Sequence, residues 1–220
     1  MTFLEFQKYL AVDHILNDYI KKNVNFSKIE IKKKEKYSFS PNKIVLIEKG
    51  TVFQLATEES PFLIRDSSVN DFIYMGQKYP TSKIIFEAVE KSSLLEFETE
   101  ELITFLDKEK LLTSFLYQIG MKTTEDLNHL AFLATLSAKE RANYTLFRLM
   151  EKYGEKQENG TYLLPSWINV KIISRISNCG IVNTSREINT LIDNGILFVY
   201  EKKWLMIDSV LNNHQSIPSY

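Results

Sequence analysis

Read as a helix, the segment 181–193 presents on one side polar groups that can bond to DNA bases. Asparagine can make two hydrogen bonds to adenine, arginine can make two to guanine, and valine or threonine methyl groups can contact the thymine methyl group. The side chains on this side are Val182, Asn183, Arg186, Asn189 and Thr190. This combination favours recognition of base edges. The alternative is an ordinary solvent-exposed helix in a small α/β domain.

Further polar side chains flank this segment and could hold a sugar–phosphate backbone, which would fix the register of a reading helix. They are Lys171, Arg175, Ser185, Lys202 and Lys203. Taken singly, each of the four basic side chains is more often just a surface charge. Glu187 lies beside the base-reading side and would repel phosphate if it were aimed at DNA.

The rest of the chain offers no signature of catalysis. The one cysteine, Cys179, cannot form an internal disulfide or hold an iron–sulfur cluster, and it is best read as a small buried hydrophobe. The three histidines are scattered, and no HxxxH or CxxC spacing is present, which argues against a zinc site. The GxxxxGK[ST], GxGxxG and GxSxG motifs are also missing. We therefore expect no enzyme, no metal and no cofactor.

The composition is that of a globular protein with one large or two small domains. Of the 220 residues, 44% are apolar and 25% are charged, and the net charge of −1 argues mildly against a non-specific nucleic-acid coat. It still permits a sequence reader that keeps its cations on one face. No run of about 18 apolar residues is present, and the first residues lack the basic and apolar blocks of a signal peptide. We expect a cytoplasmic protein that makes no membrane contact.

Two kinds of pattern precede the candidate reading segment. Residues 4–22 have a rough helical spacing of apolar positions, and 28–97 hold many short β-rich runs separated by turn residues, which favours a sandwich or barrel. The lysines at 32–34 suit a solvated strand face or edge. Helical character returns at Glu98, where Thr99 could cap a short helix.

A longer helix is expected from about 108 to 136, with its middle weakened by Gly120 and by Thr123 and Thr124. Nearly 30 helical residues span roughly 40 Å, which is more than a small domain needs. Two interpretations remain open: packing against the β-rich domain, or a dimer seam in a helix that joins two domains. The residues expected at the dimer interface are Leu112, Phe115, Leu116, Ile119, Leu127 and Leu130.

The C-terminal part reads as helix, helix, tight turn, helix and hairpin, the order of a winged helix-turn-helix. Ser137 and Glu140 fit a capping box, Gly154 ends the first helix, and Ser166 or Asn169 can cap the next. Gly180 would permit the tight turn. The inward positions of the last helix are expected to be Ile181, Thr184, Ile188 and Leu191.

Almost the whole chain resembles the Crp/Fnr family of transcription regulators. The stretch LNHLAFLATLSAKERANYTLFRLMEKYGE (127–155) is similar to the end of that family's dimer helix and its s-x-x-x-R step, here Ser137 to Arg141. The stretch PSWINVKIISRISNCGIVNTSREINTLIDNGILFVYEKKWLMIDSVL (165–211) resembles the helix-turn-helix, wing and terminal strand. Looser likeness covers IVLIEKGTVFQL (44–55) and FEAVEKSSLLEFETEELITFL (86–106), which resemble elements of the β-roll.

The resemblance implies an α+β homodimer that binds double-stranded DNA. Its parts would be an antiparallel, jelly-roll-like β-roll sensor domain (1–107), a central dimerisation helix (108–136) and a winged helix-turn-helix domain (137–220). The recognition helix would be Ile181 to Asp193, and the family's arginine near its middle matches Arg186. Many members have an Arg-Glu pair where this chain has Ile181-Val182, so the usual operator of the family is not expected.

The sensor side departs further from the family pattern. Cyclic-nucleotide-binding members carry a Gly-Glu pair for the ribose and an Arg-Ser or Arg-Thr pair for the phosphate. Here Gly76 is followed by Gln77, and the second pair falls near Ser82-Lys83. Without the arginine fork and the glutamate, the nucleotide loses its bidentate donor and its acceptor. We predict that cyclic AMP does not bind, as in the PrfA-like branch.

Other functions fit the same residues. The winged domain could dock on a protein instead of DNA, or the chain could bind DNA constitutively with a β-roll that senses nothing. If the β-roll does sense a signal, an unidentified small-molecule effector would be a further partner. Activation would require a surface that contacts RNA polymerase, and no residue spacing identifies one.

Overall fold

The computed structural model describes residues 14–38, 42–55, 62–74 and 85–207. The chain divides into two compact units, residues 1–131 and 132–220. Within the described residues, no helix has the length and apolar character needed to cross a membrane. Residues 4–13 of the first expected helix lie outside the described residues, as do Gly76, Gln77, Ser82 and Lys83.

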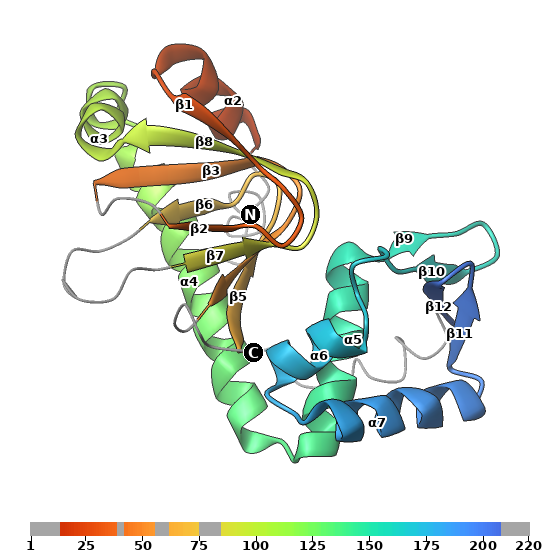
Figure 1. Cartoon of the computed structure of the whole chain (residues 1–220). Coiled ribbons are helices and arrows are strands. Elements are labelled where there is room, and N and C mark those ends of the chain that lie inside the picture. The colour runs from red at the N-terminus through yellow and green to blue at the C-terminus, as the bar shows by residue number, and fades with distance from the viewer. Residues whose placement is uncertain (1–13, 39–41, 56–61, 75–84, 208–220) are drawn as a thin grey trace, which may run out of the picture. The chain divides into compact units, whose positions relative to one another are not determined.

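The first unit contains the expected antiparallel β-roll (Figure 1). One sheet has the strand order β1-β8-β3-β6, and the other has the order β2-β7-β4-β5. The strands are β1 (Ser27–Ile31), β2 (Lys36–Ser38), β3 (Lys43–Lys49), β4 (Val52–Leu55), β5 (Leu63–Ser67), β6 (Phe72–Tyr74), β7 (Ile85–Ala88) and β8 (Ser92–Glu98). Gly50 makes the turn from β3 to β4 at a φ of +85°, and a Cβ there would lie 2.3 Å from Ser92 Oγ. The turn therefore requires glycine.

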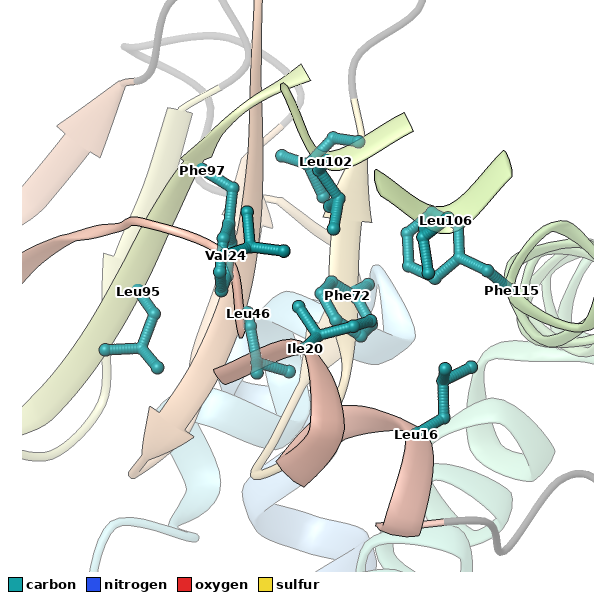
Figure 2. Packing of buried hydrophobic residues seen from close by; sticks show 11 residues of the cluster. Leu16, Ile20, Val24, Leu46, Phe72, Leu95, Phe97, Leu102, Leu106 and Phe115 are labelled. Atoms are coloured by element: carbon teal, nitrogen blue, oxygen red, sulfur yellow. The ribbon is translucent and has the colours of Figure 1, made fainter. Parts of the chain in front are cut away.

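Alternating residues of β3 and β8 serve two separate cores, because successive side chains of a strand point to opposite faces. Val45 and Leu94 face the space between the two sheets, where residues of both sheets pack. Leu46 and Leu95 face the opposite side, which the helices cover (Figure 2). The sheet that holds these strands is therefore buried on both faces.

Three helices pack against the sheet to complete the second core, whose buried side chains are drawn in Figure 2. They are α2 (His14–Asn23), α3 (Thr99–Lys108) and the start of α4 (Leu112–Thr135). Phe115 of α4 stands edge-on to Phe72 of β6, with 4.9 Å between the ring centroids. The expected cap of α3 is wrong: Glu98 is the N-cap residue without a side-chain hydrogen bond, and Thr99 lies inside the first turn.

The second unit has the winged helix-turn-helix order that the sequence predicted. Its elements are α5 (Ala138–Tyr153), β9 (Glu155–Lys156), β10 (Thr161–Leu163), α6 (Val170–Ser177), α7 (Ile181–Asp193), β11 (Leu197–Tyr200) and β12 (Lys203–Ile207). The strands form one sheet in the order β11-β12-β10-β9. The three helices pack against one another, so the sheet and helices form a small unit with its own core.

Local sequence signals explain most helix ends of this unit. The capping box of Ser137 and Glu140 is confirmed, and Asn169, not Ser166, caps α6 by accepting from the Ile172 amide at 3.1 Å. Gly154 ends α5 as expected but with an ordinary φ of −71°. Glycine is required there for space, because a Cβ would lie 2.4 Å from the Met150 carbonyl oxygen.

The tight turn between α6 and α7 does not use Gly180 in the expected way. The left-handed residue is Asn178, with φ of 50°, whereas Gly180 has φ of −61° and has open space where a Cβ would stand. Asparagine tolerates the left-handed region better than most residues, because its short polar side chain bonds locally. Cys179 is buried as predicted, and its Sγ donates a hydrogen bond to the Ala138 carbonyl at 3.0 Å.

Candidate nucleic-acid interface

The side of α7 that faces the protein holds it in place and leaves the other side in solvent. Thr184, Ile188 and Leu191 are buried, and Thr184 Oγ1 also donates to the Gly180 carbonyl at 3.2 Å. Ile181 was expected to join them but is 53% exposed, so that assignment is wrong. The helix is anchored by its middle and C-terminal turns rather than by its first residue.

The opposite side of α7, which we call the reading face, consists of the five residues predicted to contact bases. Val182, Asn183, Arg186, Asn189 and Thr190 are all exposed. Their spacing places them on successive turns of one side, and the helix rises about 12 Å from residue 182 to residue 190. An α-helix with its side chains is about 10–12 Å across, which fits the DNA major groove, about 12 Å wide.

Glu187, the acidic side chain that the sequence places beside the reading face, is turned towards α5. Glu187 Oε2 lies 3.6 Å from Lys139 Nζ of α5, and the Glu187 side chain is only 16% exposed. The carboxylate thus faces the neighbouring helix and is paired there. The repulsion of phosphate that the sequence raised as an objection is reduced by this placement.

The predicted backbone contacts lie on three elements of the second unit. Lys171 is exposed in the first turn of α6, and Arg175 and Ser185 are half-buried on α6 and α7. Lys202 and Lys203 are exposed at the β11–β12 turn, which the positive φ of Lys202 (64°) helps to form. These residues therefore come from α6, from α7 itself and from the β11–β12 turn.

Along α4, exposed side chains recur at alternating steps of three and four residues. We call this stripe the seam; its members are Thr113, Leu116, Gly120, Thr123, Leu127 and Leu130. Such spacing is that of the a and d positions of a coiled coil. Leu127 and Leu116 are 60% and 53% exposed, which leaves large apolar side chains in water.

Three residues assigned to the dimer interface from the sequence face the roll instead. Phe115 is 1% exposed in the helical core, and Leu112 and Ile119 pack partly buried against the same core. Each of them directly precedes a member of the seam, so the two stripes interleave in the sequence. The interface assignment is therefore corrected to exclude Phe115, and Leu112 and Ile119 can contribute only at the margin.

Comparison with known proteins by sequence finds no matching family model and no matching curated protein. Solved structures do match over nearly the whole chain. A cyclic nucleotide-binding domain containing protein from Listeria monocytogenes EGD-e has a TM-score of 0.73 at 18% identity, with 94% of this chain and 98% of that chain covered.

Two regulators match similarly. The c-di-GMP responsive global regulator CLP of Xanthomonas campestris has a TM-score of 0.69 at 14% identity, covering 87% of this chain and 97% of its own. A CRP/FNR family transcriptional regulator from Thermus thermophilus has a TM-score of 0.66 at 16% identity, with 85% and 97% covered. The chain has the Crp/Fnr fold.

In this Crp/Fnr fold, the inner face of the roll carries a carboxylate. Glu96 of β8 lies on the same side of its strand as Leu94, which belongs to the core between the sheets. Glu96 Oε1 accepts a hydrogen bond from Tyr37 Oη at 2.9 Å, and Lys43 Nζ lies 3.8 Å from Glu96 Oε2. Burial and the neighbouring carboxylate raise the pKa of Tyr37 to about 12.

The Crp/Fnr roll is also tied to α4 by charge. Arg65 Nε of β5 lies 2.6 Å from Asp126 Oδ2 of α4, and both side chains are less than one-fifth exposed. Lys122 Nζ lies 3.5 Å from the other oxygen of Asp126, one turn earlier on the helix. The contact of α4 with the roll thus changes from apolar at Phe115 to ionic at Asp126.

Proposed function

We propose that the protein is a sequence-specific DNA-binding transcription regulator that acts as a homodimer on a palindromic site. Each α7 enters a major groove, and the two half-sites lie about one helical turn apart. The observation that supports this most directly is the reading face, where amides, one arginine and small methyl groups stand exposed on a helix fixed from its other side.

The roles of individual side chains follow from their chemistry. Arg186 would bond to guanine, Asn183 and Asn189 to adenine, and the methyl groups of Val182 and Thr190 would contact thymine. Thr190 Oγ1 already donates to the Arg186 carbonyl at 3.0 Å, which directs its proton away from DNA and leaves its oxygen to accept. Specificity is therefore expected to rest mainly on Arg186 and the two amides.

Backbone contacts would complete the interface. Lys171, Arg175, Ser185, Lys202 and Lys203 supply cations and a hydroxyl around α7, and such contacts set the register without reading sequence. The exposed lysines at the β11–β12 turn would act as a wing on the flanking backbone.

Dimerisation would use the seam of α4. A monomer leaves Leu116, Leu127 and Leu130 in water, whereas pairing of two seams along a two-fold axis would bury all three on both chains. Gly120 lies in the same stripe with no atom near its Cβ position, so it would let the two helices approach closely. The two-fold axis of the dimer would then match a palindrome in the DNA.

Cyclic AMP would not control this dimer. The sequence lacks the arginine fork and the glutamate that hold the nucleotide in related proteins. Any signal that the roll senses would act by shifting the population of α4 conformations, and so the spacing of the two reading faces.

Two rival functions predict different measurements. A winged-helix module that docks on a protein would bind DNA weakly or not at all, and a constitutive DNA binder would have the same operator affinity with and without a cell extract. Neither RNA polymerase nor an effector is required by the interface described above. Both remain partners to be tested once the operator is known.

Salt dependence of DNA binding separates the DNA reader from the protein-docking module. We expect the affinity for duplex DNA to fall by orders of magnitude between about 50 and 200 mM salt, because each phosphate contact releases counterions. Lys203→Gln should reduce the slope of log affinity against log salt by about 0.9. Lys91→Gln, at an exposed lysine of the roll, is the matched control and should leave the slope unchanged. Salt-independent binding, or equal slopes for wild type and Lys203→Gln, would contradict the proposed contacts.

A further inference from the structure

One arginine of the second unit bonds to three backbone carbonyl groups from two distant stretches of chain. Arg141 lies in the first turn of α5. Its Nε donates to the Ser177 carbonyl at 3.0 Å, its Nη1 to the Leu136 carbonyl at 3.1 Å and its Nη2 to the Asn178 carbonyl at 3.4 Å. The guanidinium thereby joins the end of α4 to the turn that leads into α7.

The three acceptors are groups that a helix leaves without partners. α4 ends at Thr135 and α6 ends at Ser177, and the last carbonyls of a helix have no acceptor role within it. The C-terminal end of a helix also carries partial negative charge, so a cation placed there is stabilised. Arg141 satisfies the ends of two helices at once.

Two more contacts join the first turn of α5 to the same region. Cys179 Sγ bonds to the Ala138 carbonyl at 3.0 Å, and Lys139 Nζ lies 3.6 Å from Glu187 Oε2 of α7. Residues 138, 139 and 141 therefore contact the turn 177–179 and α7 itself. These contacts fix where α7 begins and how it is rotated about its axis.

We infer that Arg141 is a positioning residue that sets the orientation of the reading face relative to the end of α4. This inference rests on the proposed DNA-binding function, since orientation matters only if α7 reads a site. Arg141 acts through α7 and does not contact DNA itself, because three of its five N–H donors are already used on backbone carbonyls.

Only arginine can make this connection. A guanidinium presents nitrogens at fixed directions in one plane, whereas a lysine ammonium is a single point charge on a flexible chain. Arg141→Lys would keep the charge but could not reach the Leu136, Ser177 and Asn178 carbonyls together. If Arg141→Lys loses operator affinity although it keeps the positive charge, Arg141 acts by positioning α7 and not through its charge alone.

The test compares Arg141→Gln and Arg141→Lys with Arg148→Gln in the full-length protein. Arg148 lies seven residues further along α5, so the control removes the same charge from the same helix. Operator affinity, affinity for unrelated duplex DNA and the salt slope are measured for each variant. Hydrogen exchange of the amides from Cys179 to Leu191, without DNA, reports the order of the turn and of α7.

We expect Arg141→Gln and Arg141→Lys to lose about tenfold or more in operator affinity. Their affinity for unrelated DNA and their salt slopes should match wild type, and exchange in the turn should accelerate. Arg148→Gln should match wild type in operator affinity and in exchange of the turn. A salt slope that is reduced in Arg141→Gln and kept in Arg141→Lys would show a direct phosphate contact and overturn the inference, as would full operator affinity in either variant.

The hydrogen-exchange result keeps this inference separable from the proposed function. If the wild-type protein binds no DNA but the turn loosens in both Arg141 variants, the proposed function fails while the positioning of α7 stands. Unchanged exchange in the variants would remove the positioning role whatever the DNA measurements give.

Discussion

Replacing one leucine of the seam with alanine tests whether two α4 helices pair. The expected loss of dimerisation free energy follows from the fraction of that leucine that is exposed in the single chain. A fully buried leucine side chain contributes about 2 kcal/mol. Leu127 is 60% exposed in the single chain, so covering the exposed part contributes about 1.2 kcal/mol per chain and about 2.4 kcal/mol per dimer. Leu127→Ala should therefore raise the dimer dissociation constant about 50-fold.

Sedimentation equilibrium over a range of protein concentrations measures this constant directly. Asn128→Ala is the matched control, because it places alanine at the next exposed position of α4, outside the seam. The unfolding of the single chain should change little in either variant, since neither side chain is part of the core. If Leu127→Ala and Asn128→Ala dimerise equally well, α4 does not pair through the seam.

Three other substitutions test separate parts of the structure. Arg186→Ala should cost about 1–3 kcal/mol in operator binding and relax specificity at one base pair; operator affinity equal to wild type in a fluorescence titration would show that Arg186 is misassigned. Tyr37 has a pKa raised from 10.0 to about 12, so the stability it contributes is present below pH 10 and is lost as the pH rises towards 12. Urea unfolding of wild type and Tyr37→Phe should thus differ more at pH 8 than at pH 12, and a constant difference would contradict the Glu96 hydrogen bond. Asp126→Asn should destabilise the protein by about 3 kcal/mol, because it leaves Arg65 largely buried without its charge partner; the double variant with Arg65→Met should recover part of that loss in denaturant unfolding.

The reading face could be predicted from the sequence because it depends on one helical period. Buried residues at 184, 188 and 191 mark the inner side, and the polar residues between them must then face outward. Ile181 was misplaced because the period assigns a side but does not show whether a neighbour reaches the first turn. Periodicity thus predicted the face of α7 and not the extent of its packing.

The interface on α4 was only partly predictable, for a geometric reason. Adjacent residues of a helix are about 100° apart, so two neighbouring stripes interleave in the sequence as one broad apolar pattern. Phe115 and Leu116 follow each other, yet one packs against Phe72 and the other stands in solvent. The sequence alone could not show which stripe the roll covers.

Contacts between distant stretches of chain were beyond sequence reasoning. Arg141 was visible as part of a family pattern, but its bonds to Ser177 and Asn178 join residues 36 and 37 positions away. The tight turn was attributed to Gly180 because glycine is the usual residue in tight turns, whereas Asn178 is the residue that adopts the left-handed conformation there. Both features depend on where α5 packs, which no local pattern reports.

Selection of bound sites from a random duplex DNA library, with the full-length wild-type protein, measures whether two α7 helices read a two-fold symmetric site. The selection should enrich an inverted repeat whose half-sites are centred about 10 base pairs apart, one helical turn of DNA. Recovery of no enriched sequence, or of a single motif without two-fold symmetry, would contradict the assignment of α7 as the reading helix of a dimer.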